Sequence, residues 1–409
     1  HAVKRVVDQL EGAYALGVIS KEEPDKIVAV RKDSPLIIGA GEKENFLASD
    51  VPALIKYTRD VYYIENDQYV LLTKDDVKIY DSLLQELSLP LSHVDWDVES
   101  AEKEGFEHFT LKEIHEQPKG IMQTVSRRLH HGEIDIEFTL SEEILKNTEK
   151  VIIVACGTAY HAGLVGKFII ENYADIPVQV EVASEFRYTK QFVNERTLFI
   201  AISQSGETLD TLSALRKARE NGAKVLSILN VVGSSMARES DEVFYTWAGP
   251  EIGVASTKAY TTQLASLYLI GLKMAKVLGR IDDGRYHELT KSLEELPKLS
   301  EEVLSSEETI RELSYQQFNN ESIFFIGRGV DYYTALEASL KLKELSYINS
   351  LAIQAGELKH GTIALIEEGT LVVVFSTKKE FEDKTVSSIK EVKARGAKVL
   401  SIITKGCEK

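Results

Sequence analysis

The sequence predicts an α/β protein in which two tandem units with mostly parallel sheets follow a smaller antiparallel α+β piece. From about residue 119 onward, apolar runs of strand length alternate with helical patterns, which is typical of parallel βαβ units. The heptapeptide Gly-Ala-Lys-Val-Leu-Ser-Ile occurs at 222–228 and again at 396–402, which indicates an internal duplication. Residues 1–95 contain instead short β-like runs separated by turn signals, which predict the antiparallel piece.

The composition excludes several classes of function. The chain has 409 residues, 44% hydrophobic and 27% charged, which suits a globular protein of two or three domains. Its formal net charge of −16 argues against general binding to nucleic acid or to anionic membranes. Its 2 cysteines make no disulfide framework, and no apolar run reaches membrane-spanning length. We therefore expect a cytoplasmic protein that binds neither nucleic acid nor membranes.

The N-terminal piece is expected to cover residues 1–95. It begins inside a helical pattern, residues 2–10, so we expect further sequence upstream of it in the protein. Its expected strands are 13–19, 26–30, 36–38, 62–64, 69–72 and 77–80.

A linker is expected between this piece and the first unit. Residues 82–108 show no clear period and include a cluster of acids from 95 to 107, so we interpret this stretch as linker-like. We assign the linker itself to residues 96–118, with a short helix from 109 that Pro118 stops.

The first unit, residues 119–281, is expected to bind phosphate, and its predicted strands are 151–155, 178–182, 198–202, 225–229 and 243–246. The second unit, residues 282–409, opens with a helix-rich segment, 287–318, and its predicted strands are 322–326, 371–375 and 399–403. It ends soon after a strand, so we expect its sheet to be truncated. The sequence Ser-Thr-Lys-Lys-Glu at 376–380 stands where the first unit has a run of hydroxyls, so the two units should differ in function.

That run of hydroxyls, residues 203–208, is the strongest candidate site. Ser203, Gln204, Ser205 and Thr208 surround a glycine where an apolar strand passes into a helical pattern. A helix N-terminus offers unpaired N–H groups and partial positive charge, so a phosphate can bind there without a lysine. One serine would suffice for an ordinary helix cap, and no Walker spacing is present, so we favour an anion site.

Two further loops are candidates in the first unit. Thr158 follows the strand 151–155 at a turn that should line the same edge of the sheet, where it can bind phosphate or sugar. At this turn Cys156 is more often a buried strand-end thiol than a nucleophile, and His161 more often packs in the following helix than reacts. The loop 250–260 combines proline, glycine and hydroxyls; a helix cap at Ser256 or Thr257 and a sugar-binding loop are about equally supported.

The second unit carries candidate acid–base groups. Glu337, Lys341 and Glu344 are spaced to lie on one helix face, which usually means solvent-exposed ion pairs. The helix follows a Gly-Arg-Gly turn, however, so a carboxylate on that face can also move a proton between adjacent carbons of a substrate. His360, in the glycine-flanked loop 355–361, suits acid–base opening of a sugar ring, although a lone loop histidine is more often structural.

Together these motifs resemble the glutamine–fructose-6-phosphate amidotransferase family. The matching strings are CGTAYHAG, SQSGET, GPEIGVASTKAYT, LKLKELSYI and AGELKHG, with GAYAL, SPLIIG, ENFLASD and LKEIHEQP upstream. The resemblance covers essentially the whole chain. It implies two tandem sugar-isomerase (SIS) domains with parallel-sheet sandwiches, preceded by part of an α+β N-terminal-nucleophile glutaminase domain.

The resemblance also implies a role for each candidate residue. Ser203, Gln204, Ser205 and Thr208 would bind the phosphate of fructose 6-phosphate, and Thr158, Val254, Ala255 and Ser256 would help to hold the sugar. Glu344 would move a proton between C1 and C2, with Lys341 and Glu337 beside it. His360 would open the sugar ring in the neighbouring subunit's site, which implies a homodimer. No cofactor or metal is implied.

The implied reaction is the transfer of ammonia from glutamine to fructose 6-phosphate with isomerisation to glucosamine 6-phosphate. The family's nucleophilic cysteine and glutamine-binding motifs would lie upstream of His1, and its C-terminal lysine beyond Lys409, so this chain should carry mainly the isomerase half and should not hydrolyse glutamine alone. Ala159 stands where many members have serine. The alternatives are another SIS-domain sugar-phosphate isomerase or deglycase, and a sugar-phosphate sensor without catalysis.

Overall fold

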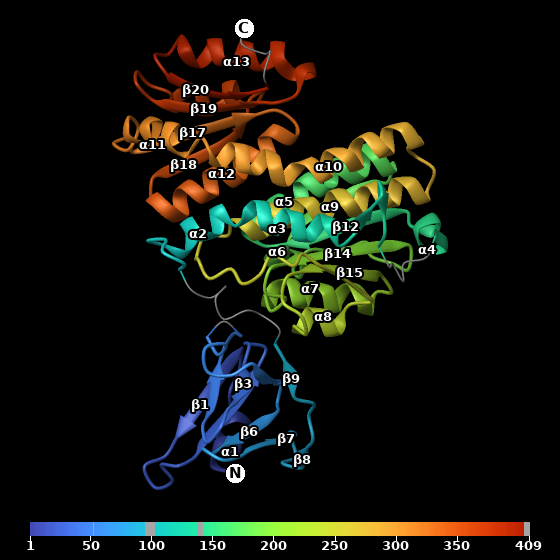
Figure 1. Cartoon of the computed structure of the whole chain (residues 1–409), viewed down its shortest axis with the longest axis vertical. Helices are drawn as coiled ribbons and strands as arrows, with labels where there is room; N and C mark the ends of the chain where they lie inside the picture. The colour runs from blue at the N-terminus through green and yellow to red at the C-terminus, as the bar shows by residue number, and fades with distance from the viewer. Residues whose placement is uncertain (52, 95–102, 137–141, 405–409) are drawn as a thin grey trace.

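The computed structural model describes residues 1–51, 53–94, 103–136 and 142–404. Its N-terminal piece, at the bottom of Figure 1, consists of a short helix and two antiparallel sheets in the orders β1-β2-β6-β7-β8 and β4-β3-β5-β9. The two sheets share a core in which Ala29 and Val70 of one meet Ile38 of the other. The elements are α1 (Ala2–Val7), β1 (Tyr14–Ile19), β2 (Ile27–Lys32), β3 (Ile37–Ala40), β4 (Asn45–Ala48), β5 (Asp60–Tyr63), β6 (Tyr69–Leu72), β7 (Val77–Tyr80), β8 (Glu86–Leu87) and β9 (Ser92–His93).

The segment that joins this piece to the first unit differs from the expectation. The stretch 82–108 is not wholly a linker, because β8 pairs with β7 and β9 pairs with β5. Both strands have two residues, too few to show a period. Pro118 does not simply stop a helix: α2 (Phe109–His115) ends before it, and Pro118 lies in the first turn of α3 (Gln117–Ser126), where its missing N–H costs no hydrogen bond. Most of the acidic cluster at 95–107 lies outside the described residues.

The first unit has a five-stranded parallel sheet in the order β13-β12-β14-β15-β16, as its alternation of strands and helices predicts. Successive residues of each strand face opposite sides: Ile153 and Ile200 pack under one layer of helices, and Ile152 and Phe199 under the other. The strands are β12 (Lys150–Ala155), β13 (Val178–Val182), β14 (Thr197–Ser203), β15 (Lys224–Leu229) and β16 (Glu242–Tyr245). Before them lie β10 (Leu129–His130), β11 (Glu133–Ile134) and α4 (Glu142–Asn147).

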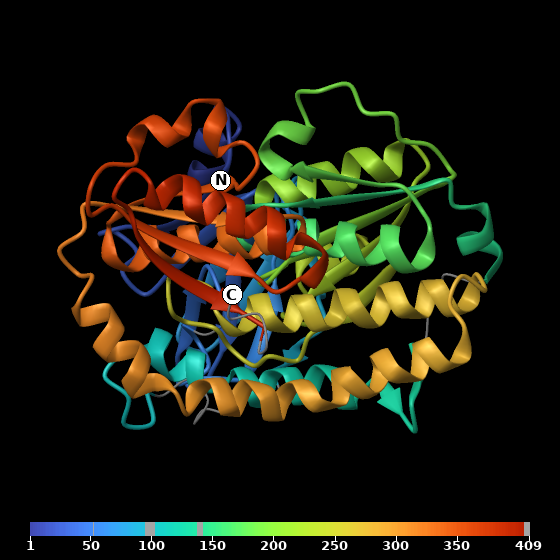
Figure 2. The ribbon, with the colours of Figure 1, turned by 90° about the horizontal axis from the view of Figure 1, so that it is seen from above.

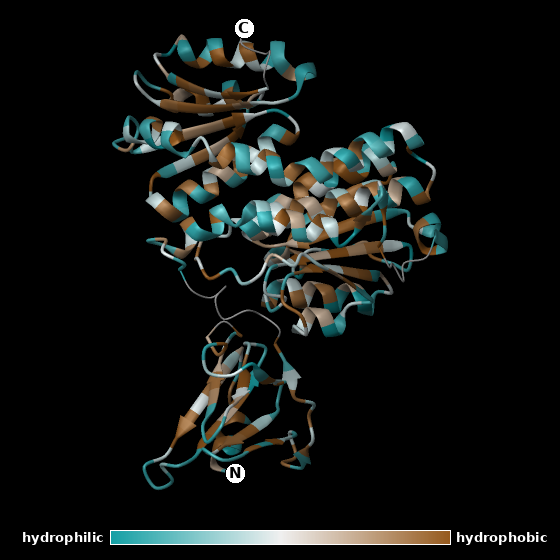
Figure 3. Cartoon of the chain, viewed as in Figure 1, coloured by the Kyte–Doolittle hydropathy of each residue, from teal (hydrophilic) through white to brown (hydrophobic). Residues whose placement is uncertain are grey.

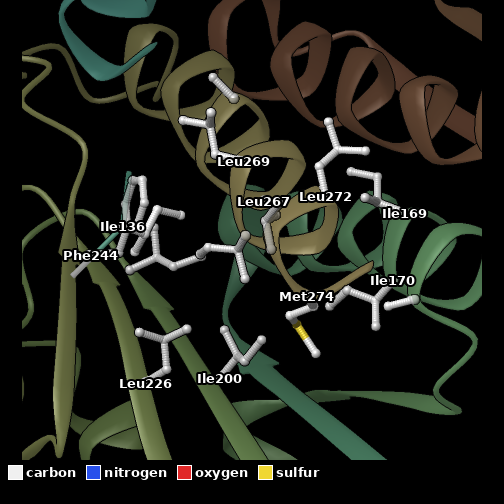
Figure 4. Close-up of a cluster of buried hydrophobic side chains, with 14 of the residues drawn as sticks. Ile136, Ile169, Ile170, Ile200, Leu226, Phe244, Leu267, Leu269, Leu272 and Met274 are labelled. Carbon is white, nitrogen blue, oxygen red and sulfur yellow. The ribbon is translucent and has the colours of Figure 1, made fainter. Parts of the chain in front are cut away.

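Two helical layers cover this sheet. One contains α3, α5 (Gly157–Ile169), the π-helical turn η2 (Ile170–Ala174) and α9 (Lys258–Val277); the other contains α6 (Ala183–Phe186), α7 (Leu209–Glu220) and α8 (Ser235–Glu239). Figure 4 shows Leu267 and Met274 of α9 facing Ile200 and Leu226 of the sheet. Each such fully buried aliphatic side chain contributes roughly 1.5–3 kcal/mol relative to an exposed one, so this core holds the strand ends in place.

The second unit has a four-stranded parallel sheet in the order β18-β17-β19-β20. Its strands are β17 (Ser322–Gly327), β18 (Asn349–Gln354), β19 (Leu371–Ser376) and β20 (Lys398–Ile403). The helix α12 (Val330–Ser346) covers one face, where Ala335 packs on Phe325, and α13 (Glu382–Lys393) covers the other, where Val392 joins Ile326. In Figure 3 the strands of both parallel sheets are predominantly brown, which marks them as the apolar interior.

Helices connect the two units. The pair α10 (Asp283–Leu304) and α11 (Glu307–Tyr315) precedes β17, and Figure 2 shows α10 running beside α9 along one side of the molecule. The short helical turns η3 (Leu358–His360), η4 (Thr362–Leu365) and η5 (Lys379–Phe381) lie in loops of the second unit. The helix α12 packs on α5, and α10 packs on α3 and α9, with Tyr286 and Leu293 of α10 buried in the core of the first unit. None of the helices described has the length and apolar character needed to cross a membrane.

The duplication read from the sequence has a structural counterpart. Ser203, which ends β14, pairs with Leu229, and Ser376, which ends β19, pairs with Ile403; in both units the pairing partner is the residue that directly follows the heptapeptide. The glycine that begins each heptapeptide lies in the left-handed region, with φ of +86° at Gly222 and +85° at Gly396. The strand β18 was not predicted, because only Ser350 and Ile353 of its six residues are buried and its sequence shows neither a continuous apolar run nor a strict alternation.

Candidate active site

The hydroxyl-rich turn predicted between strand and helix lies between β14 and α7, and we name residues 203–208 the serine loop. The buried Ser203 Oγ lies 2.9 Å from Thr208 Oγ1 and accepts the Gly206 N–H at 3.0 Å. Gly206 has a φ of +66°, which other residues adopt only with strain. The Ser203 hydroxyl therefore closes the loop on itself, while Ser205 accepts the Glu207 N–H at 3.2 Å.

Three of the predicted phosphate-binding residues line one cavity. Gln204, Ser205 and Thr208 bound a space of about 290 Å³, together with residues 49–51 of the N-terminal piece and Glu251. Thr208 is the residue before the first turn of α7, so the free N–H groups of that turn add partial positive charge beside it. This edge can therefore hold an anion without a cationic side chain.

Carboxylates fix the walls of this cavity. Glu207 accepts the Ser235 N–H at 2.7 Å, so the serine loop is attached to the start of α8. Glu251 accepts the Ser256 hydroxyl at 2.8 Å and the Thr257 N–H at 2.8 Å. Both oxygens of Glu251 and Oε1 of Glu207 therefore accept hydrogen bonds within the protein, whereas the buried Oε2 of Glu207 has no hydrogen-bond partner among the residues that the structure describes.

The loop at 250–257 was a candidate sugar-binding loop, and the structure shows how it is held. The buried Glu113 of α2 accepts the N–H groups of Ile252 at 2.6 Å and of Gly253 at 3.0 Å. Burial raises the pKa of the Glu113 carboxyl, and these two N–H groups partly oppose that rise. Val254 is 100% exposed and Ala255 is buried, so the backbone between them turns from the core to the surface.

A polar network joins the two units at the contact of α5 and α12. Thr158 donates its hydroxyl hydrogen to Glu337 at 2.9 Å, and His161 Nδ1 lies 2.7 Å from the other oxygen of the same carboxylate. Glu337 is buried, and Lys341 Nζ lies 3.5 Å from it and also pairs with Glu344. The predicted common face of Glu337, Lys341 and Glu344 is therefore present, but it lies against the first unit at one end rather than forming only solvent-exposed pairs.

Exposure divides this network into two parts. The side chain of Glu337 is 7% exposed, that of Lys341 19%, and that of Glu344 34%. The buried part orients the helix, while Glu344 keeps an accessible carboxylate at the outer end. Such an arrangement can transfer a proton to or from a bound molecule, because Lys341 stabilises the charged carboxylate and solvent or substrate can reach it.

His360 lies apart from these groups. It ends the short helix η3 after β18, it is exposed, and no contact among the described residues joins it to Glu344 or to the serine loop. Cys156 is half-buried beside Thr211, and burial raises the pKa of its thiol, which agrees with a packed strand-end thiol rather than a nucleophile. Cys407 lies outside the described residues.

Sequence reasoning missed three residues of this region. His161 was interpreted as a packing residue, but it contacts Glu337, 176 positions away. Glu113 and Glu251 were not singled out, although both fold the 250–257 loop. The only sequence signal for Glu113 was its place in the string LKEIHEQP, because its partners are backbone N–H groups that any residue can supply.

The chain matches known proteins over its whole length. The family model described as SIS domain matches residues 144–273 and 318–406. The chain is 51% identical over 408 residues to "Glutamine--fructose-6-phosphate aminotransferase [isomerizing]" of Clostridium acetobutylicum, covering 99% of this chain and 67% of that enzyme. The Clostridium tetani protein of the same name is 52% identical over 408 residues, again with 99% and 67% covered.

A solved structure agrees with this likeness. The C-terminal domain of glucosamine-fructose-6-phosphate aminotransferase from Francisella tularensis superposes with a TM-score of 0.72 at 42% identity. The alignment covers 74% of this chain and 86% of that one.

Proposed function

Because the chain belongs to the glutamine–fructose-6-phosphate aminotransferase (isomerizing) family, within which it carries tandem SIS domains, we propose that it converts fructose 6-phosphate and ammonia to glucosamine 6-phosphate. The observation that carries the proposal is the network from Thr158 through Glu337 to Glu344, which sets an accessible carboxylate at the contact of the two units. The ammonia would come from glutamine through the glutaminase part of the protein, of which residues 1–95 form a portion.

The proposed roles follow the geometry of each group. Ser205, Gln204 and Thr208 bind the phosphate from the cavity side, and Ser203 supports them by closing the loop. Thr158, Val254, Ala255 and Ser256 hold the sugar, the last through a loop that Glu251 and Glu113 keep in shape. Ammonia adds at C2 with loss of water to give an imine. Glu344 then takes a proton from C1 and returns one to C2, while the C1 hydroxyl proton passes to the imine nitrogen, so that C1 becomes the aldehyde and C2 carries the amine.

His360 completes the proposed site from a second subunit. Its exposed position on η3, away from Glu344 of its own chain, supports a homodimer in which each histidine opens the sugar ring bound by its partner. This assembly stays a proposal, as do the domain boundaries at 95, 118 and 281. The cytoplasmic location expected from the sequence stays a prediction as well.

The test follows solvent deuterium into the product. A protein of the relatives' full length that contains this chain is incubated in D₂O with fructose 6-phosphate and ammonium, and glucosamine 6-phosphate is analysed by mass spectrometry. Glu344→Gln should slow product formation by about 10²–10⁴-fold, because the general base is lost. The matched control is Glu312→Gln, an exposed carboxyl on α11 that should leave the rate unchanged. Full activity of Glu344→Gln would contradict the proposed role.

A further inference from the structure

The second unit carries its own pocket at the edge of its sheet. An open space of about 760 Å³ lies at the carboxyl ends of β17 and β18, bounded by Gly327 and Gln354, the last residues of those strands. The turn 327–329, the start of the His360 loop at 355–357, and Lys384 of α13 complete its walls. In open parallel sheets, ligands bind outside the carboxyl ends of the strands, so this is the edge where a ligand is expected.

The lining of the pocket is cationic. Arg328, Lys359 and Lys384 face it, against the single carboxylate of Glu357. Within the described part of the chain, no ion pair joins any of these three cations to a carboxylate. Their positive charge is therefore available to a bound anion, in contrast to the serine loop, which offers hydroxyls and N–H groups.

Arg328 is positioned with donors to spare. Its Nη2 donates to Ser388 Oγ at 3.1 Å, which fixes the guanidinium against α13. Its buried Nε has no hydrogen-bond partner in the structure. A Cβ at Gly356 would lie 3.2 Å from Nη1, so glycine at this position leaves room for the guanidinium to lie across the backbone. A planar guanidinium held in this way suits the oxygens of a phosphate.

A comparison of the two units shows why the pocket of the second unit does not lie at the turn that corresponds to the serine loop. In the second unit, the turn after β19 is occupied by its own chain: the buried Asp331 of α12 accepts the Thr377 N–H at 2.9 Å and the Thr377 hydroxyl. In the turn that corresponds to the serine loop, the N–H and hydroxyl of Thr377 are therefore already bonded to a carboxylate of the same chain. The open pocket lies instead beside the 327–329 turn, between the carboxyl ends of β17 and β18 and the start of α13, where Phe381 and Lys384 line it.

We propose that this pocket is a second anion site, which binds a small phosphomonoester of sugar-phosphate size. Three cations match a phosphomonoester, which carries about −1.5 to −2 charges near neutral pH. The volume is within the range of small-molecule sites, and its open side has room for the group that bears the phosphate. Lys359 precedes His360 on the same helical turn, so a bound phosphate also restrains the His360 loop (residues 355–361).

Binding to the 409-residue chain tests the proposal. The chain carries Ser205→Ala, which weakens the proposed first site, and calorimetry measures inorganic phosphate and glucose 6-phosphate separately. Both should bind, glucose 6-phosphate more tightly. Adding Lys384→Gln or Arg328→Gln should weaken each by roughly tenfold, because a hydrogen bond to a charged group is lost. Since Lys384 is exposed, Lys384→Gln should not impair folding, and circular dichroism verifies this.

The matched control is Lys390→Gln, an exposed lysine on the same helix outside the pocket, which should change affinity by less than about twofold. No binding of either compound, or equal weakening by Lys390→Gln and Lys384→Gln, would overturn the site. Equal affinity for both compounds would overturn the assignment of a monoester. A failed serine-loop assignment has a different signature, because Ser205→Ala would then leave phosphate binding unchanged while Lys384→Gln still weakened it.

Discussion

The two SIS units share a strand order and an identical heptapeptide, yet their ligand edges are built from different chemistry. In the first unit, the loop after β14 is closed by hydroxyls and left open to a cavity. In the second, the loop after β19 is closed by the carboxylate of Asp331. The two units keep the same residue where the backbone conformation requires it: Gly222 and Gly396 both lie in the left-handed region, with nearly equal φ angles. The strand ends, which carry little of the core, have diverged into a proposed phosphate site and a proposed source of acid–base groups.

The largest effect should come from placing a Glu344 variant and a His360 variant in different subunits of one dimer. Glu344→Gln and His360→Ala are each expected to inactivate a homodimer of the full-length protein. In a mixed dimer, one site carries both lesions and the other carries neither. Co-refolding equal amounts should restore roughly a quarter of wild-type product formation, because half of the dimers are mixed and each has one intact site.

Subunit exchange in that mixture is verified by native mass spectrometry. Activity that stays at the level of the single mutants despite exchange would show that each subunit holds a complete site. The control mixes Glu344→Gln protein with a second Glu344→Gln preparation, in which no intact site can form.

Asp331→Ala should be the most destabilising change in the second unit. The substitution leaves the Thr377 N–H and hydroxyl without their acceptor, and each bond to a charged group contributes roughly 1.5–3 kcal/mol. Urea unfolding should show the loss, while phosphate binding at the serine loop should not change. Asp383→Ala, an exposed acid in the first turn of α13, is the control and should cost at most about 1 kcal/mol. Equal stability of the two variants would show that Asp331 does not hold the loop.

Ser205→Ala should affect the first unit alone. Loss of one hydrogen bond to the phosphate should weaken fructose 6-phosphate binding by roughly 1.5–3 kcal/mol and leave any binding of free fructose unchanged. Calorimetry with both sugars makes the comparison, and Ser213→Ala, farther along α7 and outside the cavity, is the control. An equal loss for both sugars would remove the phosphate assignment.

The smallest effect concerns the loop at 250–257. Burial raises the pKa of Glu113, so the folded protein holds a proton there more tightly than the unfolded chain does. Stability from this group is therefore present at low pH and is lost as pH rises from the unfolded value through the folded one. Glu113→Gln should flatten that decline in urea unfolding as the pH rises above about 4.3, the ordinary pKa of a glutamate. A steeper decline in the variant would contradict the direction of the shift.

Local patterns predicted most of the fold. The apolar runs that became β12, β14 and β15 are buried on both faces, so each reads as a continuous strand. The edge strand β18 has neither a continuous apolar run nor a strict alternation, and β8 and β9 are too short for any period, so these were missed. Pro118 was predicted to stop the preceding helix, but α2 ends at His115 and Pro118 lies in the first turn of α3.

The candidate site was predictable only where its residues are neighbours in the chain. The serine loop was visible because several hydroxyls follow one strand, and Glu337, Lys341 and Glu344 because helical spacing aligns them. The contact of His161 with Glu337 joins two units, and the pocket around Arg328 draws its cations from three elements. Contacts between residues so far apart in the chain leave no periodic pattern in the sequence, since they depend on how whole helices and strand ends pack together.

The position of Asp331 affects whether the second unit can bind the anion that the first unit is proposed to bind. A tethered carboxylate competes with dissolved anions at the effective concentration of an intramolecular ligand, which is millimolar even for flexible tethers and higher for a rigid helix. A dissolved anion must therefore displace the Asp331 carboxylate to reach the N–H and hydroxyl of Thr377 in the turn after β19. We therefore expect this turn of the second unit to bind a substrate phosphate more weakly than the serine loop does, because a side chain of the same chain already accepts its hydrogen bonds.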